Sequence, residues 1–425
     1  MPRLPSSQAG SSVGHAAPAF PPVTDASEPD QPTDDSQLSV LTLNVWGLNY
    51  ISKLRVPRIK AIATHLASRS TPNYDFVCLQ EIWYESKDWR FLKHALAARY
   101  PHSKFFYSGA FGSGLAILSR WPILESDTQP YSLNGQPINV GQGDWFVGKA
   151  CGCVTVDHPR LGLVDVWNTH FVAAGGEDGP EYKRSHRITQ AAIQELGVTC
   201  DSPLNTWTAG KPLDERATRG AGKRLDYVFF RGPVDADSTT GPALSYAASA
   251  SSRGKLACKS SSVVVTDIVP DLNCSYSDHF GVESIFDIIS DPPPSTSDAA
   301  RKVGQHRVLT ASLHALSGGF AASRSTQMSH FYVFGAALLL AISLIVASIF
   351  QPLGGVNPVF VLLAVVAGWA GTTMLYSALV WGEWEKRTLR TVMELIELEL
   401  EHLRPSQNGA ASRTSADQAA TGTLF

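Results

Sequence analysis

Polar residues stand at the ends of several predicted strands, where side chains from different parts of the chain can meet. Asn44 ends the first apolar run of the sequence, Glu81 follows the second, and Asp278 and His279 come just before the last. A carboxylate and an amide at the ends of neighbouring strands can bind a hard cation such as Mg²⁺ through oxygen. An Asp-His pair beside that ion can supply a general base. Each residue alone is more typical of a turn or a solvated loop, so the prediction of a site rests on all of them together.

Asp144 and Lys149 form a second polar group, in the sequence DWFVGKA. Its Gly-Lys pair is similar to part of a phosphate-binding loop, but Ala stands where such a loop has its hydroxyl for Mg²⁺, and the leading glycine is missing. A nucleotide site is therefore disfavoured. We expect Lys149 to contact a lipid phosphate or to pair with Asp144, and the alternative is a surface salt bridge of little energetic weight.

A mixed set of strands and helices must position these residues. Runs of β-branched and apolar residues predict strands, and apolar residues three and four apart predict helices. Many strands with fewer helices indicate two packed sheets flanked by helices, an α/β class of fold. A stretch rich in Ser, Ala and Gly is predicted to be a surface insertion at 232–262. Strands are expected at 39–48, 74–80, 104–107, 114–118, 149–156, 163–170, 224–230, 262–268 and 280–286, and helices at 56–66, 92–99 and 181–196.

Two long apolar runs follow this domain. Residues 331–350 and 358–381 carry no charge over 20 and 24 residues, and a bilayer core needs about 20 such residues per helix. We therefore predict a two-helix transmembrane hairpin, with two buried helices of a soluble domain as the alternative. Lys and Arg residues flank both outer ends of the hairpin, which predicts that the N-terminal domain and the C-terminus face the cytosol.

An amphipathic helix is predicted after the hairpin, at 383–404. Its apolar stripe over 389–403 fits a partner helix or a membrane surface, and the acidic residues of its later half favour the partner helix. The remaining segments are predicted from composition. They are a disordered tail at 1–37, the α/β domain at 38–290, a linker at 291–329 and a second disordered tail at 405–425.

The composition argues against several classes of function. Lys and Arg number 35 against 38 Asp and Glu, a formal net charge of −3, so the cationic excess that bulk nucleic-acid binding requires is absent. The six cysteines form no Cys-x-x-Cys pair, which excludes a zinc ribbon and a thioredoxin-type motif. The first twenty residues show no apolar signal segment, so we expect reduced thiols on the cytosolic side of a membrane.

Taken in order, the motifs resemble those of the neutral sphingomyelinases, membrane-anchored members of the DNase I-like endonuclease/exonuclease/phosphatase superfamily. The similarity covers residues 38–286 and extends to the two apolar spans, and fungal relatives in this family cleave inositol phosphosphingolipids. It implies a four-layered α/β sandwich with the site at one edge of two facing sheets. The implied products are ceramide and a phosphorylated head group. The matching motifs are LTLNVWGL, LQEIW, SGLAILSRWPI, DWFVGKA, NTH, RLDYVFF and SYSDHFGV.

The resemblance also implies a role for each residue of the expected metal and base site. Glu81 is expected to be the principal Mg²⁺ ligand, with Asn44 nearby on the metal or the phosphate. His279 is the expected general base, and Asp278 helps to hold the metal or the water. Asp226 is expected to orient His279 through a carboxylate–imidazole hydrogen bond.

The remaining implied roles concern the substrate. His170 is expected to contact the phosphoryl oxygens and to steady the developing charge. The family uses a pair equivalent to Asp144 and Lys149 to switch between closed and substrate-ready forms. The implied partners are a membrane sphingolipid and an anionic phospholipid activator.

The sequence departs from the family pattern in two places. The family often has the motif NTHxHA, whereas FVA follows His170 here, so the second His is absent. A Gly-Asp-x-Asn motif is expected at the end of a strand after the helix at 181–196, and none occurs between His170 and Asp226. A strand and its loops are therefore missing near 194–200.

This gap leaves alternatives open. We expect residues 196–206 to cross irregularly where a central strand would lie, with Glu81 and His279 still converging. One alternative to an active sphingolipid hydrolase is an impaired family member, or a truncated gene model that lacks the motif. An inositol-polyphosphate phosphatase or a nuclease of the same superfamily is less favoured, because the hairpin and the near-neutral charge do not fit it.

Overall fold

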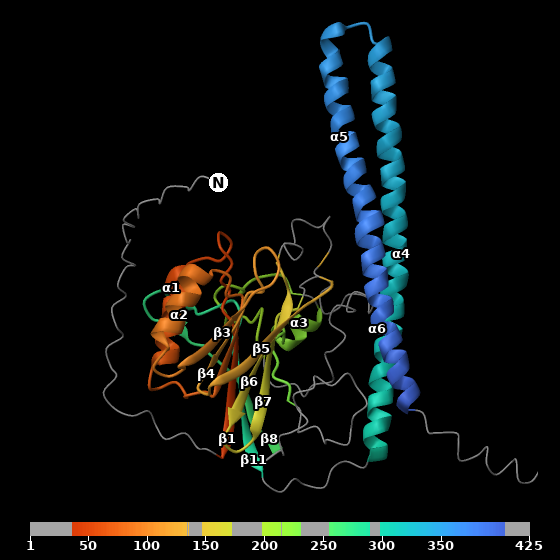
Figure 1. Ribbon diagram of the computed structural model, residues 1–425. Coiled ribbons are helices and arrows are strands. Elements are labelled where there is room, and N and C mark those ends of the chain that lie inside the picture. The colour runs from red at the N-terminus through yellow and green to blue at the C-terminus, as the bar shows by residue number, and fades with distance from the viewer. Residues whose placement is uncertain are drawn as a thin grey trace, which may run out of the picture.

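The computed structural model describes the greater part of the 425-residue chain (Figure 1). Asp144, the predicted helix at 181–196 and both predicted tails, apart from Ser36 and Gln37, lie outside the described residues. The residues described are 36–133, 135, 147–171, 198–213, 215–230, 255–289 and 298–403.

The α/β domain is built from short strands and four helical segments. In chain order its elements are β1 (Gln37–Asn44), α1 (Arg55–Ala67), β2 (Phe76–Gln80), the π-helix η1 (Glu85–Trp89), α2 (Arg90–Ala95), β3 (His102–Phe106), β4 (Leu115–Ser119), β5 (Ile123–Pro130), β6 (Ala150–His158), β7 (Gly162–Thr169), α3 (Glu215–Gly220), β8 (Lys255–Val264), β9 (Ile268–Val269), β10 (Cys274–Ser275) and β11 (Gly281–Ile289).

Two sheets face each other in this domain. The larger has the strand order β3-β4-β2-β1-β11-β8, in which only β1 and β2 run parallel, and the smaller has the order β5-β6-β7. Apolar side chains fill the space between them: Phe106 and Ile117 of the larger sheet share a buried cluster with Val154 of the smaller. A Cβ on Gly152 would lie 2.6 Å from the Phe106 ring, so the sheets approach closely there. The predicted pair of packed sheets is confirmed.

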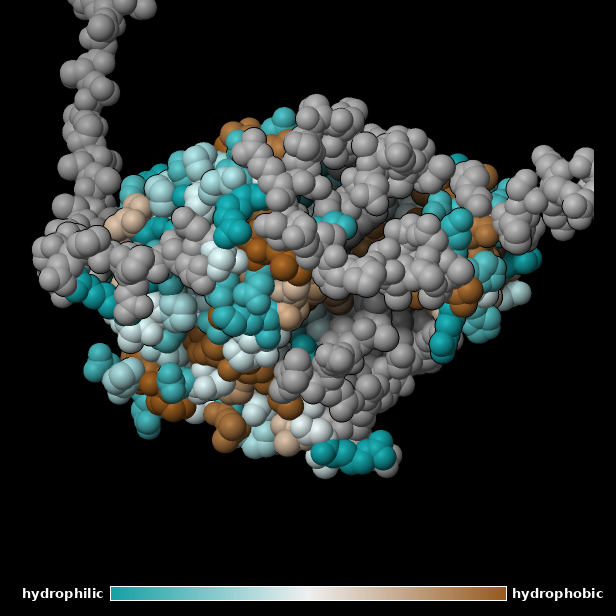
Figure 2. Space-filling model, turned by 90° about the horizontal axis from the view of Figure 1, so that it is seen from below, coloured by the Kyte–Doolittle hydropathy of each residue, from teal (hydrophilic) through white to brown (hydrophobic). Residues whose placement is uncertain are grey.

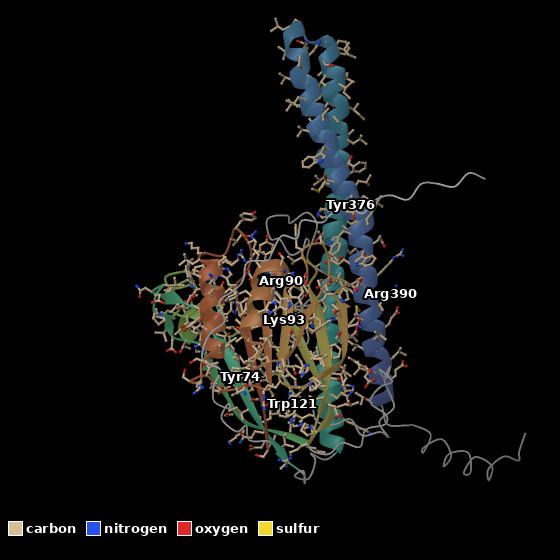
Figure 3. The ribbon with its side chains drawn as sticks, turned by 60° about the vertical axis from the view of Figure 1, so that its left-hand side comes forward. Tyr74, Arg90, Lys93, Trp121, Tyr376 and Arg390 are labelled. Atoms are coloured by element: carbon tan, nitrogen blue, oxygen red, sulfur yellow. The ribbon has the colours of Figure 1, made fainter. Side chains whose placement is uncertain are left out.

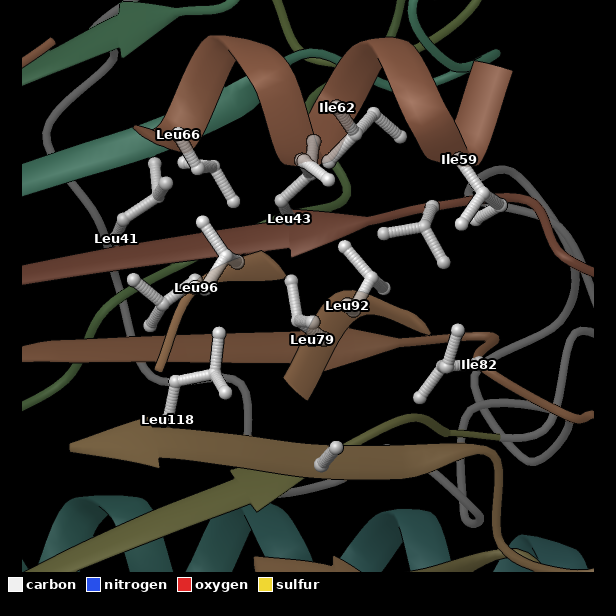
Figure 4. Packing of buried hydrophobic residues seen from close by; sticks show 14 of the residues in the cluster. Leu41, Leu43, Ile59, Ile62, Leu66, Leu79, Ile82, Leu92, Leu96 and Leu118 are labelled. Atoms are coloured by element: carbon white, nitrogen blue, oxygen red, sulfur yellow. The ribbon is translucent and has the colours of Figure 1, made fainter. Parts of the chain in front are cut away.

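Helices α1 and α2 cover the outer face of the larger sheet. Leucines of β1 and β2 pack against the apolar stripes of the two helices (Figure 4). Helices, larger sheet and smaller sheet therefore form successive layers among the described residues, as the predicted α/β class requires; the helix predicted at 181–196 lies outside them. The residues labelled in this core are Leu41, Leu43, Ile59, Ile62, Leu66, Leu79, Ile82, Leu92, Leu96 and Leu118.

The two-residue repeat of a strand decides which side chains reach the space between the sheets. Leu41 and Leu43 of β1 point to the helices, so Asn44 points to the opposite face, toward the smaller sheet. On β2, Gln80 lies on that face too, and its Nε2 donates to Oδ1 of Asn168 in β7 at 2.7 Å. Nδ2 of Asn168 donates in turn to the carbonyls of Leu79 and Ala116, at 2.8 and 3.0 Å. This buried amide cluster joins the two sheets next to the carboxyl ends of β1 and β2.

Several predicted boundaries are wrong. Residues 224–230, expected as a strand, have no ladder partner among the described residues. Strand β8 begins at Lys255, inside the predicted insertion at 232–262, and pairs with β11. Strand β5 was not expected, because most of its side chains are exposed and it carries few apolar residues.

The predicted linker at 291–329 is also helical over most of its length. The C-terminal elements are α4 (Asp298–Phe350), the 3-10 turn η5 (Gly354–Val356), α5 (Asn357–Tyr376), the π-helix η6 (Ser377–Trp381) and α6 (Gly382–Leu403). Helix α4 packs against α5 in its second half and against α6 in its first half (Figure 1). The amphipathic helix predicted at 383–404 thus has its helix partner within the same chain.

Two of these helices are long and apolar enough to cross a membrane, as judged by length and composition. No residue is buried in the most apolar 18-residue window of the first, and 11% are buried in that of the second. Core helices of a soluble domain would bury such windows, so the exposure disfavours that alternative and is compatible with a lipid environment.

Candidate active site

Glu81 lies where β2 ends, in a backbone conformation that L-residues rarely adopt. Its φ is +57°, in the left-handed region. Its carbonyl oxygen accepts the N–H of Gly47 at 2.9 Å. A Cβ at Gly47 would lie 2.4 Å from that oxygen, so only glycine permits the contact. Strained residues of this kind persist where the surrounding structure holds them and are common at functional sites.

Asn44 lies beside Glu81, as expected for neighbouring parallel strands. Its Oδ1 accepts the backbone N–H of Trp46 at 2.9 Å, and a backbone N–H can only donate, so the orientation of the amide is determined. Its Nδ2 therefore faces Glu81 and donates to Oε1 at 2.9 Å. Of the two expected roles of Asn44, this orientation favours a hydrogen bond to the phosphate over ligation of the metal.

His170 follows β7 and reaches the same place from the smaller sheet. Its Nδ1 is 2.7 Å from Nζ of Lys149, and its Nε2 is 3.8 Å from Oε1 of Glu81. Burial lowers the pKa of His170 well below its usual value, and the charges of Lys149 and His279 lower it further. His170 is therefore neutral. Because an ammonium group only donates, Nδ1 accepts and the ring proton lies on Nε2, toward Glu81.

Lys149 is buried, with 3% of its surface exposed, which excludes the surface salt bridge considered from the sequence. The neighbouring Gly148 lies against the backbone of Gly109, where an added Cβ would come within 2.3 Å of the Gly109 nitrogen. Loop 107–113 is thereby held beside Lys149. Asp144, the predicted partner of Lys149, lies outside the described residues.

His279 and Asp226 are far apart in the sequence and adjacent in the structure. Nδ1 of His279 lies 2.8 Å from Oδ2 of Asp226. Burial by itself would lower the pKa of His279, but the charge and the hydrogen bond of Asp226 outweigh it and raise the pKa well above its usual value. The pairing leaves Nε2 as the ring nitrogen that can exchange a proton with a substrate or a water molecule.

Asp278 completes the set of predicted residues. Burial raises its pKa, His279 lowers it, and the negative charge of Glu81 raises it again. Two carboxylates that repel each other in a largely buried site suit a hard divalent cation. Among the described residues, however, no group of three or more His, Cys, Asp or Glu side chains could hold a metal ion. A cation here would therefore take Glu81, with Asp278 close by, and fill its other positions with water or substrate oxygens, as Mg²⁺ usually does.

The segment before Asp226 crosses beside the site without forming a strand. Cys200 makes isolated bridges to Lys223 on one side and to His279 on the other. The N–H of Phe280 donates to the carbonyl of Thr199 at 2.7 Å. Residues 198–206 are thus the irregular crossing that was expected. Glu81 and His279 still converge: Oε1 of Glu81 lies 3.8 Å from Nε2 of His170, and the charges of Glu81 and His279 both shift the pKa of Asp278.

Arg58, which was not predicted, ties the two halves of the site together. The residue is fully buried in α1, and its guanidinium donates to the carbonyls of Val45, Trp46 and Tyr276 at 3.1, 2.7 and 2.9 Å. Val45 follows Asn44, and Tyr276 stands two residues before Asp278. Burial lowers the pKa of Arg58 to about 10, so the group stays charged at neutral pH.

The sequence does carry one signal for Arg58. The residue precedes Ile62 by four positions and Leu66 by eight, so it shares their face of the helix. An Arg on an apolar stripe is a candidate for a buried, fully hydrogen-bonded group. The rings of Trp46 and Trp207 lie 4.6 and 5.7 Å from its guanidinium carbon and cover it.

Comparison with known proteins places this geometry among phosphodiesterases. Residues 41–179 match the Endonuclease/Exonuclease/phosphatase family. The chain is 30% identical over 327 residues to an inositol phosphosphingolipids phospholipase C of Schizosaccharomyces pombe, covering 61% of this chain and 70% of the relative. It is 27% identical over 462 residues to the protein of that name in Saccharomyces cerevisiae, covering 86% and 90%.

Sphingomyelinases match over a shorter part of the chain. A putative neutral sphingomyelinase of Drosophila melanogaster is 40% identical over 157 residues, which cover 36% of this chain and 34% of the relative. Among solved structures, sphingomyelinase C from Streptomyces griseocarneus aligns with 58% of this chain and 98% of its own, at 17% identity and a TM-score of 0.35.

Proposed function

Because the chain belongs to the family of inositol phosphosphingolipid phospholipases C and neutral sphingomyelinases, we propose that it hydrolyses a membrane sphingolipid to ceramide and a phosphorylated head group. The observation that carries this proposal is the convergence of Glu81, His170 and the His279–Asp226 pair at one edge of the two sheets. The acid, base and donor groups needed to cleave a phosphodiester with water are then in one place.

The arrangement assigns a task to each residue. His279, held by Asp226, takes the proton of the attacking water through Nε2 in its neutral form, which the raised pKa of the ring makes the minor form at neutral pH. His170 is neutral and directs its Nε2 proton into the site, and Asn44 offers an N–H group beside it, so both can donate to phosphoryl oxygens. Lys149 holds His170 in the required tautomer. A bound Mg²⁺, held by Glu81 with Asp278 nearby, would polarise the phosphoryl group and lower the pKa of a bound water.

The test of this function uses the full chain in phosphatidylcholine vesicles that contain either sphingomyelin or an inositol phosphosphingolipid. We expect release of the phosphorylated head group from one of the two lipids, dependent on Mg²⁺ and abolished by a chelator. The Glu81→Gln variant keeps the shape of the side chain and removes the charge, so it should lose both activity and the response to Mg²⁺. Hydrolysis of both lipids at an undiminished rate in the presence of the chelator would reject the metal assignment.

A weakly active chain is the second possibility, and one observation favours it. The alignment with the Saccharomyces cerevisiae relative spans 462 positions, more than the 425 residues of this chain, so that relative carries segments without a counterpart here. The irregular crossing at 198–206 fits the loss of such a segment. In that case the same assay would give little product, and inserting a strand with the Gly-Asp-x-Asn motif after residue 197 would raise the rate.

The hairpin supports a membrane anchor with both chain ends in the cytosol. The exposed apolar windows of the two long helical stretches are suited to lipid, and basic residues flank the outer ends of both spans. Protease added to vesicles whose cytoplasmic side faces outward should digest the α/β domain and leave the hairpin protected. Protection of the α/β domain in such vesicles would show the opposite orientation.

A further inference from the structure

Three loops surround the site residues, and we call them the rim loops. Residues 45–54 follow Asn44 directly, and residues 107–113 lie beside Lys149 through the contact of Gly109 with Gly148. Residues 202–208 are held to the chain before His279, since Nδ2 of Asn205 donates to the carbonyl of Ser277 at 2.9 Å.

The rim loops expose large apolar side chains to an unusual degree. Tyr50 is 99% exposed and Ile51 66% in the first loop, Phe111 is 63% exposed in the second, and Leu204 is 76% exposed in the third. Lys53 is the one charged residue in the sequence of the three loops, although charged residues make up 17% of the chain. A solvated loop would carry more charge, and apolar side chains gathered around a site mark a contact surface.

The direction of the strands places the rim loops at the end of the domain nearest the hairpin tip. Tyr74, just before β2, and Trp121, just after β4, are labelled at the end away from that tip (Figure 3). Strand β2, and β1 parallel to it, therefore run toward the tip and carry Glu81 and Asn44 there. The loop after β1 is seen at this end (Figure 1). The opposite end shows hydrophilic and hydrophobic residues intermixed (Figure 2).

A contact with α6 holds this end of the domain beside the domain-side ends of the two apolar runs. Trp384 Nε1 donates to the carbonyl of Ser132 at 2.9 Å. Ser132 follows Pro130, which pairs with Ala150 beside Lys149, so the contact lies on the site side of the smaller sheet. Trp384 comes three residues after Trp381, the last residue of the second apolar run. Tyr376, within that run, is labelled just beyond the domain on the side of the hairpin tip (Figure 3).

We propose that Tyr50, Ile51, Phe111 and Leu204 rest in the head-group layer of the bilayer that holds the hairpin, so that the site opens directly onto lipid in the same membrane. This inference rests on the proposed function and adds the surface through which the substrate enters. The hairpin belongs to the same chain, so it keeps the rim loops close to the bilayer. A separate protein partner would have to bind before it could cover them. Lys53 is placed to meet lipid phosphates, as basic residues at membrane-contacting surfaces do.

The first test compares two substrates for the full chain in phosphatidylcholine vesicles. One is the sphingolipid within the same bilayer, and the other is a water-soluble short-chain analogue with the same head group. The double variant Tyr50→Ser, Ile51→Ser should hydrolyse the bilayer substrate about ten-fold or more slowly, because two apolar contacts with the lipid are lost. Its rate on the soluble analogue should stay within about two-fold of the unchanged chain, because neither side chain belongs to the site.

Leu124→Ser is the matched control, since Leu124 is 56% exposed at the start of β5, away from the rim loops. It should leave both rates unchanged. Equal rates of the rim variant and the unchanged chain on the bilayer substrate would overturn the proposal. If the unchanged chain hydrolyses neither substrate, the proposed function fails, and the second test still decides the docking.

The second test does not depend on activity. An environment-sensitive dye is attached at Ile51→Cys, in a chain whose exposed Cys258 is replaced by Ser, and a spin-labelled lipid serves as quencher. We expect quenching at position 51 and none at a dye on Leu124→Cys. Water-like emission without quenching at both positions would show that the rim loops do not touch the bilayer.

Discussion

Replacing His279 by Ala is expected to lower the rate of sphingolipid hydrolysis by about 10²–10⁴-fold, the usual contribution of one general base. The imidazole is held at 2.8 Å by Asp226, so its Nε2 is pre-positioned for the attacking water. The rate is measured as head-group release from vesicles, at saturating Mg²⁺.

Asp226→Asn separates orientation from proton transfer. The amide can still hold the ring, but it removes the negative charge that raises the pKa of His279. The rate should fall less than for His279→Ala, and the two substitutions together should cost no more than His279→Ala alone, because both act through one imidazole. The exposed His94 on α2 provides the control, and His94→Ala should change nothing. A fully additive double variant would mean that Asp226 has a separate role.

Arg58→Lys is expected to have the second large effect, on stability and activity together. Lysine keeps the charge but cannot reach the carbonyls of Val45, Trp46 and Tyr276 at once, so at least one of them loses its donor inside the protein. Hydrogen bonds to a charged group contribute about 1.5–3 kcal/mol each, so the free energy of unfolding should fall by about 3 kcal/mol. The strand end at Asn44 and the chain before Asp278 would lose their common support, and kcat should fall even in the folded fraction.

Arg99→Lys is a matched control for this prediction. Arg99 donates to three carbonyls, those of Leu66, Ser68 and Thr71, at the opposite end of α1, whereas Arg58 donates to a fourth as well, that of Lys53. The variant should lose stability of the same order, measured by chemical unfolding, with kcat of the folded protein preserved. If the two variants lowered kcat equally, the role assigned to Arg58 in positioning the site would be wrong.

The sequence predicted the buried strands and helices correctly, and it failed for strands that are exposed or that lack a pairing partner among the described residues. Continuous apolar and β-branched runs predicted the buried strands β1 and β2, and a period-3.6 pattern predicted the helix α1 between them, because these elements bury one or both faces. Strand β5 was missed because it is an edge strand with most side chains in water, and an exposed strand lacks the apolar pattern. The strand predicted at 224–230 has a suitable composition but pairs with no strand among the described residues, and a strand depends on its neighbour as much as on its own residues.

In the candidate site, too, some residues could be predicted from the sequence and others could not. Asn44, Glu81, Asp278 and His279 could be chosen from their positions at strand ends, and their convergence follows from the order of the strands. The tautomer of His170 and the orientation of Asn44 depend on Lys149 and on the backbone of Trp46, contacts that no spacing in the sequence specifies. Arg58 was overlooked because charged residues on helices usually face water.

The continuity of α4 has a consequence for the choice of membrane. A single helix from Asp298 to Phe350 passes from the level of the α/β domain into the apolar run, without a break at which the angle could adjust. A thicker or thinner bilayer can then be matched only by tilting or sliding the whole helix pair, each at a modest cost. Either movement would also raise or lower the α/β domain relative to the head groups. Turnover should therefore vary with acyl-chain length and reach its maximum at one bilayer thickness, so that the chain works best in organelles whose membranes have that thickness.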